Sequence, residues 1–370
     1  MEEIKMNNIS SLSVNEMVDL LINAYIKTYN TCGKMNSFPS VMLWGAPGVG
    51  KSQGVRQIAK NLEKELQIPV NVVDVRLLLF NPIDLRGIPV ADKDNSLAIW
   101  LKPKIFQMPD TGCINILFLD EISAAPQSVQ AAAYQITLDR RVGEHILPDN
   151  CIVMAAGNRV SDKSVAVKMP KALANRLMHI EIEGSYDSWM DWALKHGINE
   201  KVLGYIAYNP DRLFCFDVTK DDVAFPTPRS WEMVSNILNT ISDDVEYVKP
   251  MINGLVGVGP SLEFANYCRV YQYLPNVEDI FNGTELTIPK QLDVLYALVY
   301  SLTMKAEKYK YDELKISNSL KYASKLPSDY ANLLIQNYLL FDKNYKDFLL
   351  GLPAYRAFIS KHGAIFNGTF

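Results

Sequence analysis

The sequence predicts an α/β fold, in which a parallel sheet flanked by helices is followed by an α-helical region. Five short apolar runs alternate with charged stretches of helical periodicity, which is the pattern of parallel strands joined by crossover helices. The runs are apolar at nearly every position, as expected of strands that are covered on both faces. After Gly184 the spacing becomes helical, and residues 185–240 contain no clear apolar strand run.

The expected elements follow in order along the chain. Ser13 and Glu16 have the spacing of a capping box, and the apolar residues after them follow the helical period. Residues 51–66 are charged and periodic, which predicts a second helix. The expected strands, each a short apolar run, are 41–44, 70–75, 114–119, 151–155 and 178–182. Far along the chain, the spacing of apolar residues from Leu292 to Leu302 predicts another amphipathic helix.

Two changes of pattern divide the chain into three predicted domains. The α/β domain covers residues 1–184, and a helical domain covers residues 185–260. The second boundary follows a break that is rich in turn-forming residues, namely Gly254, Gly257, Gly259 and Pro260. Residues 261–370 are predicted to form a Tyr-rich C-terminal helical region, for which the sequence indicates no role.

Composition excludes several classes of protein. The 370 residues carry a formal net charge of −4, which favours neither nucleic acid nor an anionic membrane as a general partner. The five cysteines are scattered and form no C-x-x-C pair, so neither a disulfide framework nor a zinc site is indicated. The acidic N-terminus lacks a secretory signal, and the most apolar late stretch, 292–304, is too short to span a bilayer. We therefore expect a cytoplasmic protein without membrane insertion.

A phosphate-binding sequence follows the first strand of the predicted sheet. The pattern G-x-x-x-x-G-K-[ST] is matched in full by Gly45, Ala46, Pro47, Gly48, Val49, Gly50, Lys51 and Ser52. Glycines allow successive backbone N–H groups to point at phosphate oxygens, and the helix that begins near Lys51 adds the positive end of its dipole. Lys51 would contact the β- and γ-phosphates, and the Ser52 hydroxyl would ligate Mg²⁺. ATP and Mg²⁺ are therefore the expected ligands.

Polar side chains end two further strands. Asp120 and Glu121 follow an apolar strand, a position from which Asp120 would hold Mg²⁺ and Glu121 would activate the attacking water as a general base. Asn158 follows the next strand, where its amide could bind the γ-phosphate or the same water. The alternative for these residues is a solvated pair of acids and an ordinary turn asparagine, but their places after successive strands favour a site.

Two arginines are candidates for stabilising charge in the transition state. Arg176 precedes the last predicted strand, and Arg229 opens a helix after Pro228. An arginine over the γ-phosphate can increase the rate by about 10³ to 10⁵. The plainer interpretation of each is a surface ion pair, which is the role of most arginines.

The order of these motifs resembles that of the AAA+ ATPases over about residues 17–240. Residues 81–87, Asn-Pro-Ile-Asp-Leu-Arg-Gly, are similar to the Asp-Leu-x-Gly element of the MoxR family. Residues 88–101 are predicted to form a hairpin that turns at Asp94 and Asn95, which resembles the insertion in helix 2 of that clade. Residues 140–143 likewise resemble the hairpin before the strand-end asparagine. The resemblance implies a P-loop NTPase core of the AAA+ type, with residues 185–260 as its helical lid.

The resemblance also implies roles and partners. Asn158 corresponds to sensor 1, Arg176 to the arginine finger and Arg229 to sensor 2. Asn175 stands where an aspartate is usual before the finger, so Arg140 or Arg141 is an alternative finger. The family implies a homo-oligomeric ring, commonly a hexamer, that remodels a partner protein. A protein with a von Willebrand factor A domain is the expected type of partner.

Two other functions stay open from the sequence. One is a nucleotide-gated scaffold or switch that hydrolyses ATP slowly. The presence of Glu121, the expected general base, favours faster turnover than such a switch would need. The other is a nucleic-acid motor, whose pore could be lined by Trp100, Lys102 and Lys104 of the hairpin. The acidic balance and the plainer interpretation of Trp100, packing against its own hairpin, disfavour this motor. The sequence identifies neither the client, nor the ring size, nor the base of the nucleotide.

Overall fold

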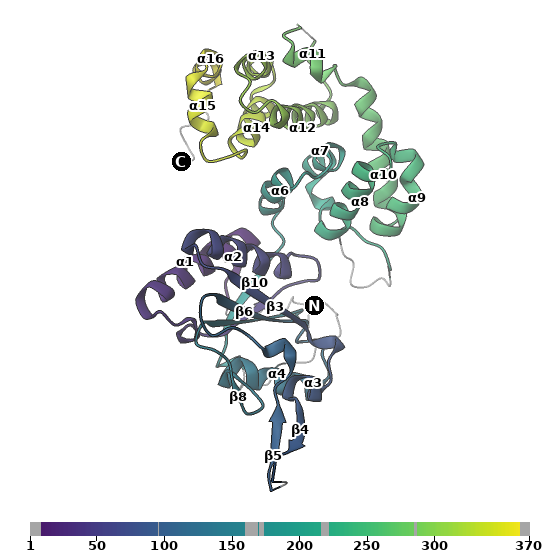
Figure 1. The fold of residues 1–370 in the computed structure, drawn as a ribbon. Helices are drawn as coiled ribbons and strands as arrows, with labels where there is room; N and C mark the ends of the chain where they lie inside the picture. The colour runs from purple at the N-terminus through teal and green to yellow at the C-terminus, as the bar shows by residue number, and fades with distance from the viewer. Residues whose placement is uncertain are drawn as a thin grey trace. The chain divides into compact units, whose positions relative to one another are not determined.

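The structure is a computed structural model that describes residues 9–94, 96–159, 169, 174–215, 222–284 and 287–362. The chain divides into two compact units, residues 1–185 and residues 186–370, and each is described by itself. Unit 1 holds the sheet, and unit 2 is helical in the part that the structure describes (Figure 1). No helix among the described residues is long and apolar enough to cross a bilayer.

Unit 1 alternates strands and helices along the chain. Its strands are β1 (Ser11–Leu12), β2 (Val41–Trp44), β3 (Val70–Arg76), β4 (Ile88–Ala91), β5 (Ala98–Leu101), β6 (Ile114–Asp120), β7 (Arg141–Val142), β8 (His145–Ile146), β9 (Cys151–Gly157) and β10 (Met178–Ile182). Its α-helices are α1 (Val14–Cys32), α2 (Lys51–Leu66), α3 (Pro82–Arg86) and α4 (Gln127–Asp139). Short 3₁₀ turns η1 (Met35–Ser37), η2 (Leu77–Leu79) and η3 (Lys104–Phe106) connect them.

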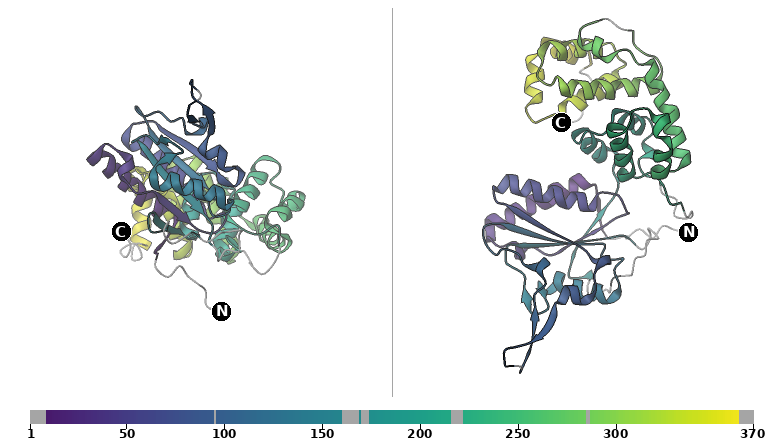
Figure 2. Two further views of the ribbon diagram at one scale, coloured as in Figure 1. Left: turned by 90° about the horizontal axis from the view of Figure 1, so that it is seen from below. Right: turned by 45° about the vertical axis from the view of Figure 1, so that its right-hand side comes forward.

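Six of these strands form one parallel sheet in the order β1-β10-β2-β9-β6-β3. Helices α1 and α2 cover one face of the sheet, and α3 and α4 lie on the other (Figures 1 and 2). Strands β2 and β9 are buried at every position, because each has a neighbour on both sides and helices above and below. All strands run the same way, so the carboxyl ends of β2, β6 and β9 meet at one edge. The predicted α/β class is confirmed.

The expectation that every strand is covered on both faces was wrong for β3. This strand lies at the end of the sheet, and Val75 alone among its residues is buried. An edge strand lacks a neighbour on one side, so apolar residues there stay partly accessible. The capping box at the start of α1 is confirmed, because Glu16 N–H donates to Ser13 Oγ and the Glu16 carboxylate accepts from Ser13 N–H.

Two small antiparallel hairpins stand apart from the main sheet. Strands β4 and β5 form the predicted hairpin of residues 88–101, although Asn95 at its turn lies outside the described residues. Gly87 precedes β4 with φ at 89°, and a Cβ there would lie 2.0 Å from the carbonyl oxygen of Leu101. Only glycine therefore fits where the hairpin begins. Strands β7 and β8 form the second hairpin, as expected near residues 140–143.

Unit 2 is built from helices in the part of it that the structure describes. They are α6 (Tyr186–Lys195), α7 (Glu200–Tyr208), α8 (Pro228–Thr240), α9 (Val245–Val256), α10 (Val258–Cys268), α11 (Val277–Phe281), α12 (Leu292–Lys308), α13 (Glu313–Ala323), α14 (Ser328–Leu339), α15 (Tyr345–Gly351) and α16 (Pro353–His362). The 3₁₀ turns η5 (Pro210–Arg212) and η6 (Arg269–Tyr273) complete them. The predicted helix near 292–302 is thus α12.

Helix α12 joins two hydrophobic cores within unit 2. Val294, Ala297 and Tyr300 on one side pack with residues of α6 to α10, whereas Leu298 and Leu302 on another side pack with residues of α11 to α16. The predicted break of residues 254–260 was wrong in extent, since α9 and α10 are separated by a single glycine, Gly257. Pro260 is accommodated because it lies in the first turn of α10, where backbone N–H groups lack helical partners.

Candidate functional site

The phosphate loop, residues 45–52, connects the central strand β2 to α2. Gly48 and Gly50 have φ values of 82° and 102°, a region that side chains with a Cβ rarely adopt. A Cβ on Gly45 would lie 2.6 Å from the carbonyl oxygen of Ile182, so the loop packs directly on the end of β10. The glycines of the pattern are therefore required by the backbone, which turns sharply before α2 begins.

Lys51 links the loop to the end of β9. Its side chain is buried, and its Nζ donates to Gly45 O at 2.7 Å, to Ala46 O at 3.0 Å and to Asn158 Oδ1 at 3.0 Å. Because an ammonium group only donates, the third bond fixes which end of the Asn158 amide faces Lys51. The predicted cation and the predicted strand-end amide are therefore in direct contact.

Ser52 and Asp120 form the second contact of the site. The Ser52 hydroxyl donates to Asp120 Oδ2 at 2.8 Å, joining the first turn of α2 to the end of β6. A hydroxyl and a carboxylate are hard oxygen ligands of the kind that Mg²⁺ prefers, and Mg²⁺ commonly keeps several waters. Among the described residues there is no group of three or more His, Cys, Asp or Glu side chains that could hold a metal ion. The donor set fits the expected Mg²⁺.

Glu121 follows Asp120 in a left-handed backbone conformation. Its φ is 59°, and its backbone N–H donates to Asp120 Oδ1 at 2.9 Å. The Glu121 side chain is exposed, so water can reach the carboxylate. A non-glycine residue in this region costs on the order of 1 kcal/mol, which the rest of the fold must offset.

Ser123 is a residue of the site that sequence reasoning missed. Its hydroxyl is buried and accepts the backbone N–H of Asn158 at 2.8 Å. A Cβ on Gly157 would lie 2.9 Å from Ser123 Oγ, so a glycine at the end of β9 permits this close approach. The contact joins residues 35 positions apart, and no local pattern in the sequence indicates it.

Two further polar contacts tie β10 to the site. Arg159, which follows Asn158, forms an ion pair with Glu181 at 2.5 Å. Trp44, the last residue of β2, donates its indole N–H to His179 Nδ1 at 2.8 Å. His179 Nε2 must then carry the ring proton, and it lies 2.7 Å from the carbonyl oxygen of Ala174. The end of β2 and the segment before β10 are therefore linked through one imidazole ring.

The candidate arginines lie outside these contacts. Arg176 is exposed in the turn before β10, and residues 170–173 of its motif lie outside the described residues. Arg229 is exposed in the first turn of α8, in unit 2. Arg140 donates to Phe38 O at 2.7 Å and to Cys151 O at 2.8 Å, and burial lowers the pKa of its guanidinium. Arg141 is exposed.

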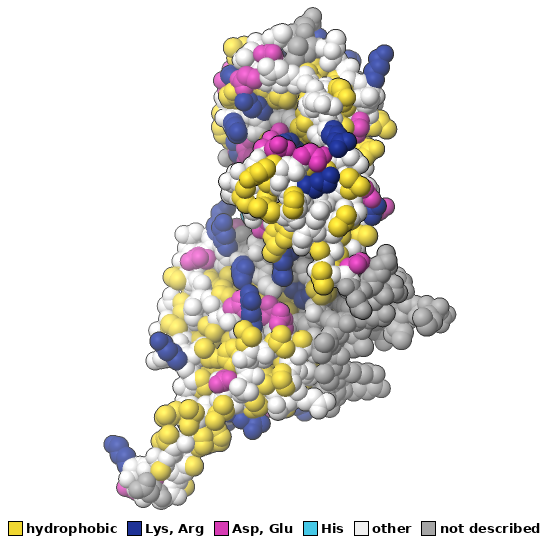
Figure 3. Space-filling view, turned by 90° about the vertical axis from the view of Figure 1, so that its right-hand side faces the viewer, with side chains coloured by type: hydrophobic (Ala, Val, Ile, Leu, Met, Phe, Trp, Pro, Cys, Tyr) yellow, Lys and Arg dark blue, Asp and Glu magenta, His cyan; other side chains and the backbone are white. Residues whose placement is uncertain are grey.

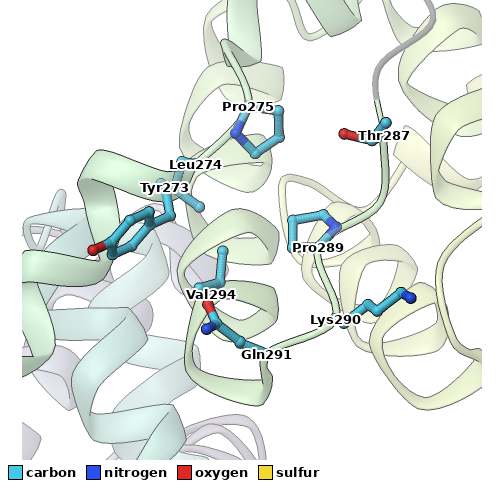
Figure 4. Close-up of a pocket in the computed structure, with 8 residues that line it drawn as sticks. All are labelled: Tyr273, Leu274, Pro275, Thr287, Pro289, Lys290, Gln291 and Val294. Atoms are coloured by element: carbon cyan, nitrogen blue, oxygen red, sulfur yellow. The ribbon is translucent and has the colours of Figure 1, made fainter.

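A pocket of about 370 Å³ lies in unit 2, between η6 and the start of α12. Figure 4 shows Tyr273 and Lys290 on opposite sides of it, with Pro275 and Pro289 between them. Among its described lining residues Lys290 is the only charged one, and there is no pair of nucleophile and base. The sheet edge of unit 1 is therefore the stronger candidate for chemistry.

Comparison with known proteins gives one informative match. Residues 41–182 match the model of the ATPase family associated with various cellular activities (AAA). None of the curated proteins matches the sequence. Among solved structures, a mutant of RuvB from Thermotoga maritima is 15% identical, with 78% of this chain and 84% of that chain covered and a TM-score of 0.35. NtrX from Brucella abortus is 13% identical, with 93% and 67% covered and a TM-score of 0.35. Likenesses with scores this low carry no argument about function.

The family match coincides with the site. It begins at the first residue of β2 and ends at the last residue of β10, so it contains the phosphate loop and the polar ends of β6 and β9. The six-stranded parallel sheet has helices on both faces. Unit 1 therefore has the AAA+ P-loop fold, and the family match supports a nucleotide-dependent ATPase.

Proposed function

We propose that this chain is a MoxR-like AAA+ ATPase that binds ATP with Mg²⁺ and hydrolyses it to remodel or assemble a partner protein. The observation that carries the proposal is the set of contacts at the carboxyl edge of the sheet. Lys51 bonds to Asn158, Ser52 bonds to Asp120, and Glu121 stands next to Asp120 with its carboxylate exposed. The ends of three strands thus bring an ammonium group, a hydroxyl bonded to a carboxylate, a second carboxylate and an amide to one edge of the sheet, which supports the proposal.

The proposed division of labour follows from the chemistry of each group. The backbone N–H groups of the loop and the Lys51 ammonium would bind the phosphate oxygens. Ser52 and Asp120 would hold Mg²⁺, which neutralises charge on the β- and γ-phosphates when it is bound. Glu121 would accept a proton from the attacking water, and the Asn158 amide would orient that water or the γ-phosphate. Ser123 fixes the backbone of Asn158 and so acts as a positioning residue.

Assembly into a ring, commonly a hexamer, is the second part of the proposal. An exposed Arg176 suits a finger that reaches the nucleotide of a neighbouring subunit. Arg140 suits that role poorly, because its guanidinium is bonded to two backbone carbonyls of its own domain. Arg141 is exposed and stays an alternative. Arg229 would act as the sensor of the lid.

The remaining assignments complete the proposal. Residues 1–184 would be the nucleotide-binding domain, residues 185–260 the lid, and residues 261–370 a C-terminal region of unassigned role. The partner would be a protein client, such as a protein with a von Willebrand factor A domain, in the cytoplasm. Differences in contacts with the γ-phosphate would shift the population of lid positions during the cycle.

Two variants test the site. Lys51→Ala removes the cation of the loop, and we expect loss of both nucleotide affinity and phosphate release in purified protein. Glu121→Gln keeps the loop and the metal ligands, so ATP should bind with little change while phosphate release falls by about two orders of magnitude or more. Fluorescent-nucleotide titration and a phosphate-release assay measure the two effects. Unchanged binding and turnover in Lys51→Ala would refute the proposed function.

Mixing of variants tests the finger. Arg176→Ala and Glu121→Gln should each be inactive alone, but a mixed ring contains interfaces that combine an intact Glu121 with an intact Arg176 from the neighbour. Mixing should therefore restore part of the turnover. Arg141→Ala serves as the matched control and should stay active alone. If Arg141→Ala is inactive and Arg176→Ala is active, then the finger assignment passes to Arg141.

A further inference from the structure

Trp44 carries a polar group into the core of unit 1, directly before the phosphate loop. Most of the large hydrophobic side chains that reach the surface of unit 1 gather over β4 and β5 and at their base (Figure 3). Trp44, in contrast, is 6% exposed and packs with residues of β6, β9 and α4. An indole N–H that is shielded from water needs a hydrogen-bond partner. In this structure the partner is Nδ1 of His179, at 2.8 Å.

The imidazole of His179 meets the indole edge to edge. The centres of the two rings are 6.1 Å apart, and their planes differ by 14°, so the N–H of one ring points along the plane of the other. The second ring nitrogen, Nε2, donates to the carbonyl oxygen of Ala174 at 2.7 Å. Since the ring is rigid, one side chain holds two backbone segments at a fixed separation.

The first of these links reaches the phosphate loop through the backbone. Trp44 is followed by Gly45, which packs so closely on Ile182 O that a Cβ would not fit. The carbonyl oxygens of Gly45 and Ala46 accept the Lys51 ammonium at 2.7 and 3.0 Å. A shift at the end of β2 would therefore move two of the groups that hold Lys51. We call this connection, from His179 Nδ1 through the indole to the loop, the loop link.

The second link reaches the turn that contains Arg176. The carbonyl oxygen of Ala174 accepts two hydrogen bonds, one from His179 Nε2 and one from the N–H of Leu177 at 3.3 Å. Arg176 lies between Ala174 and Leu177 in the chain, and its side chain is exposed. The backbone of this turn therefore sets where the guanidinium can reach. We call this connection, from His179 Nε2 to the turn, the turn link.

Other contacts hold β10 in the sheet without the imidazole. Strand β10 pairs with β2 from Met178 to Glu181, and Glu181 forms the ion pair with Arg159. Loss of either link should therefore leave the sheet intact. Its effect should be confined to the phosphate loop or to the turn of Arg176.

We propose that His179 is a positioning residue of the ATPase whose two ring nitrogens serve two different steps. The loop link holds the phosphate loop in the conformation that binds nucleotide. The turn link holds Arg176 in the position from which it acts in turnover. This inference deepens the proposed function and rests on it, because the two links end on Lys51 and Arg176, to which that proposal assigns roles.

Two substitutions of His179 separate the links by their chemistry. The amide nitrogen of glutamine is attached to Cδ, one atom beyond Cγ like histidine Nε2, so His179→Gln can keep the bond to Ala174 and lacks the acceptor for Trp44. The amide oxygen of asparagine is attached to Cγ, as histidine Nδ1 is, so His179→Asn can keep the bond to Trp44 and loses the one to Ala174. Trp44→Phe removes the loop link from its other end, and so tests this link without any change at His179.

Titration with a fluorescent ATP analogue measures nucleotide affinity, and phosphate release measures kcat. His179→Gln and Trp44→Phe should each weaken the affinity by about three- to tenfold and leave kcat near the wild-type value. His179→Asn should keep the affinity and lower kcat by about threefold or more, because Arg176 would be held less firmly. Urea denaturation checks that each variant folds.

Two further variants are controls for the loop link and for the substitution itself. Trp44→Phe combined with His179→Gln should bind nucleotide as either single variant does, since both changes remove the same hydrogen bond. His196→Gln is the matched control, because Nδ1 of His196 lies 2.7 Å from the carbonyl oxygen of Trp192, in unit 2. It should have the affinity and the kcat of the wild type.

The same measurements can overturn the proposal. A fall of affinity and kcat by one common factor in both His179 variants, or no change in either, would mean that His179 only stabilises the fold. Additive losses of affinity in the double variant would overturn the loop link, and an unchanged kcat in His179→Asn would overturn the turn link.

Failure of the proposed function gives a different result. A wild-type chain that binds nucleotide but releases no phosphate would refute the ATPase, and with it the turn link. The affinities of His179→Gln and Trp44→Phe would still decide the loop link. A wild-type chain without nucleotide affinity would refute the proposed function and the role of His179 together.

Discussion

Ser123→Ala is the substitution that tests whether the support of Asn158 matters for turnover. The Ser123 hydroxyl is 2% exposed and accepts the Asn158 N–H at 2.8 Å, and alanine fits the same space without this acceptor. Leaving a partly buried N–H without a partner costs about 1–3 kcal/mol. The free energy of unfolding of unit 1 should fall by about 1–2 kcal/mol, because Asn158 itself is only partly buried.

The same change should lower kcat, since the Asn158 amide would lose the fixed backbone that aims it. Ser40→Ala is the matched control: Ser40 is also buried, and its hydroxyl donates to Thr137 O at 2.6 Å, away from the phosphate loop. It should lower stability by about 0.5–1.5 kcal/mol and leave kcat unchanged. Urea denaturation and phosphate release measure the two quantities. If Ser123→Ala lowers the free energy of unfolding as expected but has the same kcat as Ser40→Ala, then Ser123 stabilises the fold and has no role in turnover.

Two further predictions concern groups outside the phosphate loop. Hydrogen bonds, first from Lys305, lower the pKa of Glu278 to about 2, so its stabilisation is present above the unfolded value of 4.5 and is lost as the pH falls toward 2. Glu278→Gln should therefore lower the free energy of unfolding at pH 7. Urea titrations should also show a smaller decrease of that free energy between pH 5 and pH 2 in the variant than in the wild type. The same decrease in both proteins would contradict this prediction. Trp44→Phe removes the donor to His179 and should cost about 1 kcal/mol, measured by urea denaturation. Trp192→Phe is its control, because that indole N–H has no partner among the described residues, and an equal loss in both would contradict the role of the bond.

The central strands could be predicted because burial on both faces leaves a strong local signal. The bounds of β2 and β10 agree with the expected residues, and those of β9 extend two residues further. Strand β1 could not be predicted, because its two residues gain their place only by pairing with Glu181 and Ile182, far along the chain. The exposure of β3 likewise depends on its place at the end of the sheet, which the order of strands in the sequence does not contain.

Some contacts of the candidate site could likewise be predicted from the sequence, and others could not. Spacing within residues 45–52 and the polar ends of β6 and β9 predicted the residues that the structure brings together. The support of Asn158 by Ser123 depends on a contact between two loops, and nothing in the composition of either loop indicates it. The hairpin formed by β4 and β5 is a third case. It was expected from its sequence, and Trp100, which was expected to pack against this hairpin, is half-buried.

The left-handed backbone at Glu121 has a consequence for engineering the protein. Glycine or asparagine adopts such a φ more easily, so either would relieve strain there. Selection for thermal stability alone would therefore favour these replacements. The selected protein would be more stable but would lack the carboxylate that is proposed to activate water. Thermal stability and ATP turnover thus place opposite demands on residue 121. A library designed to raise stability without loss of turnover would need to leave this residue unchanged.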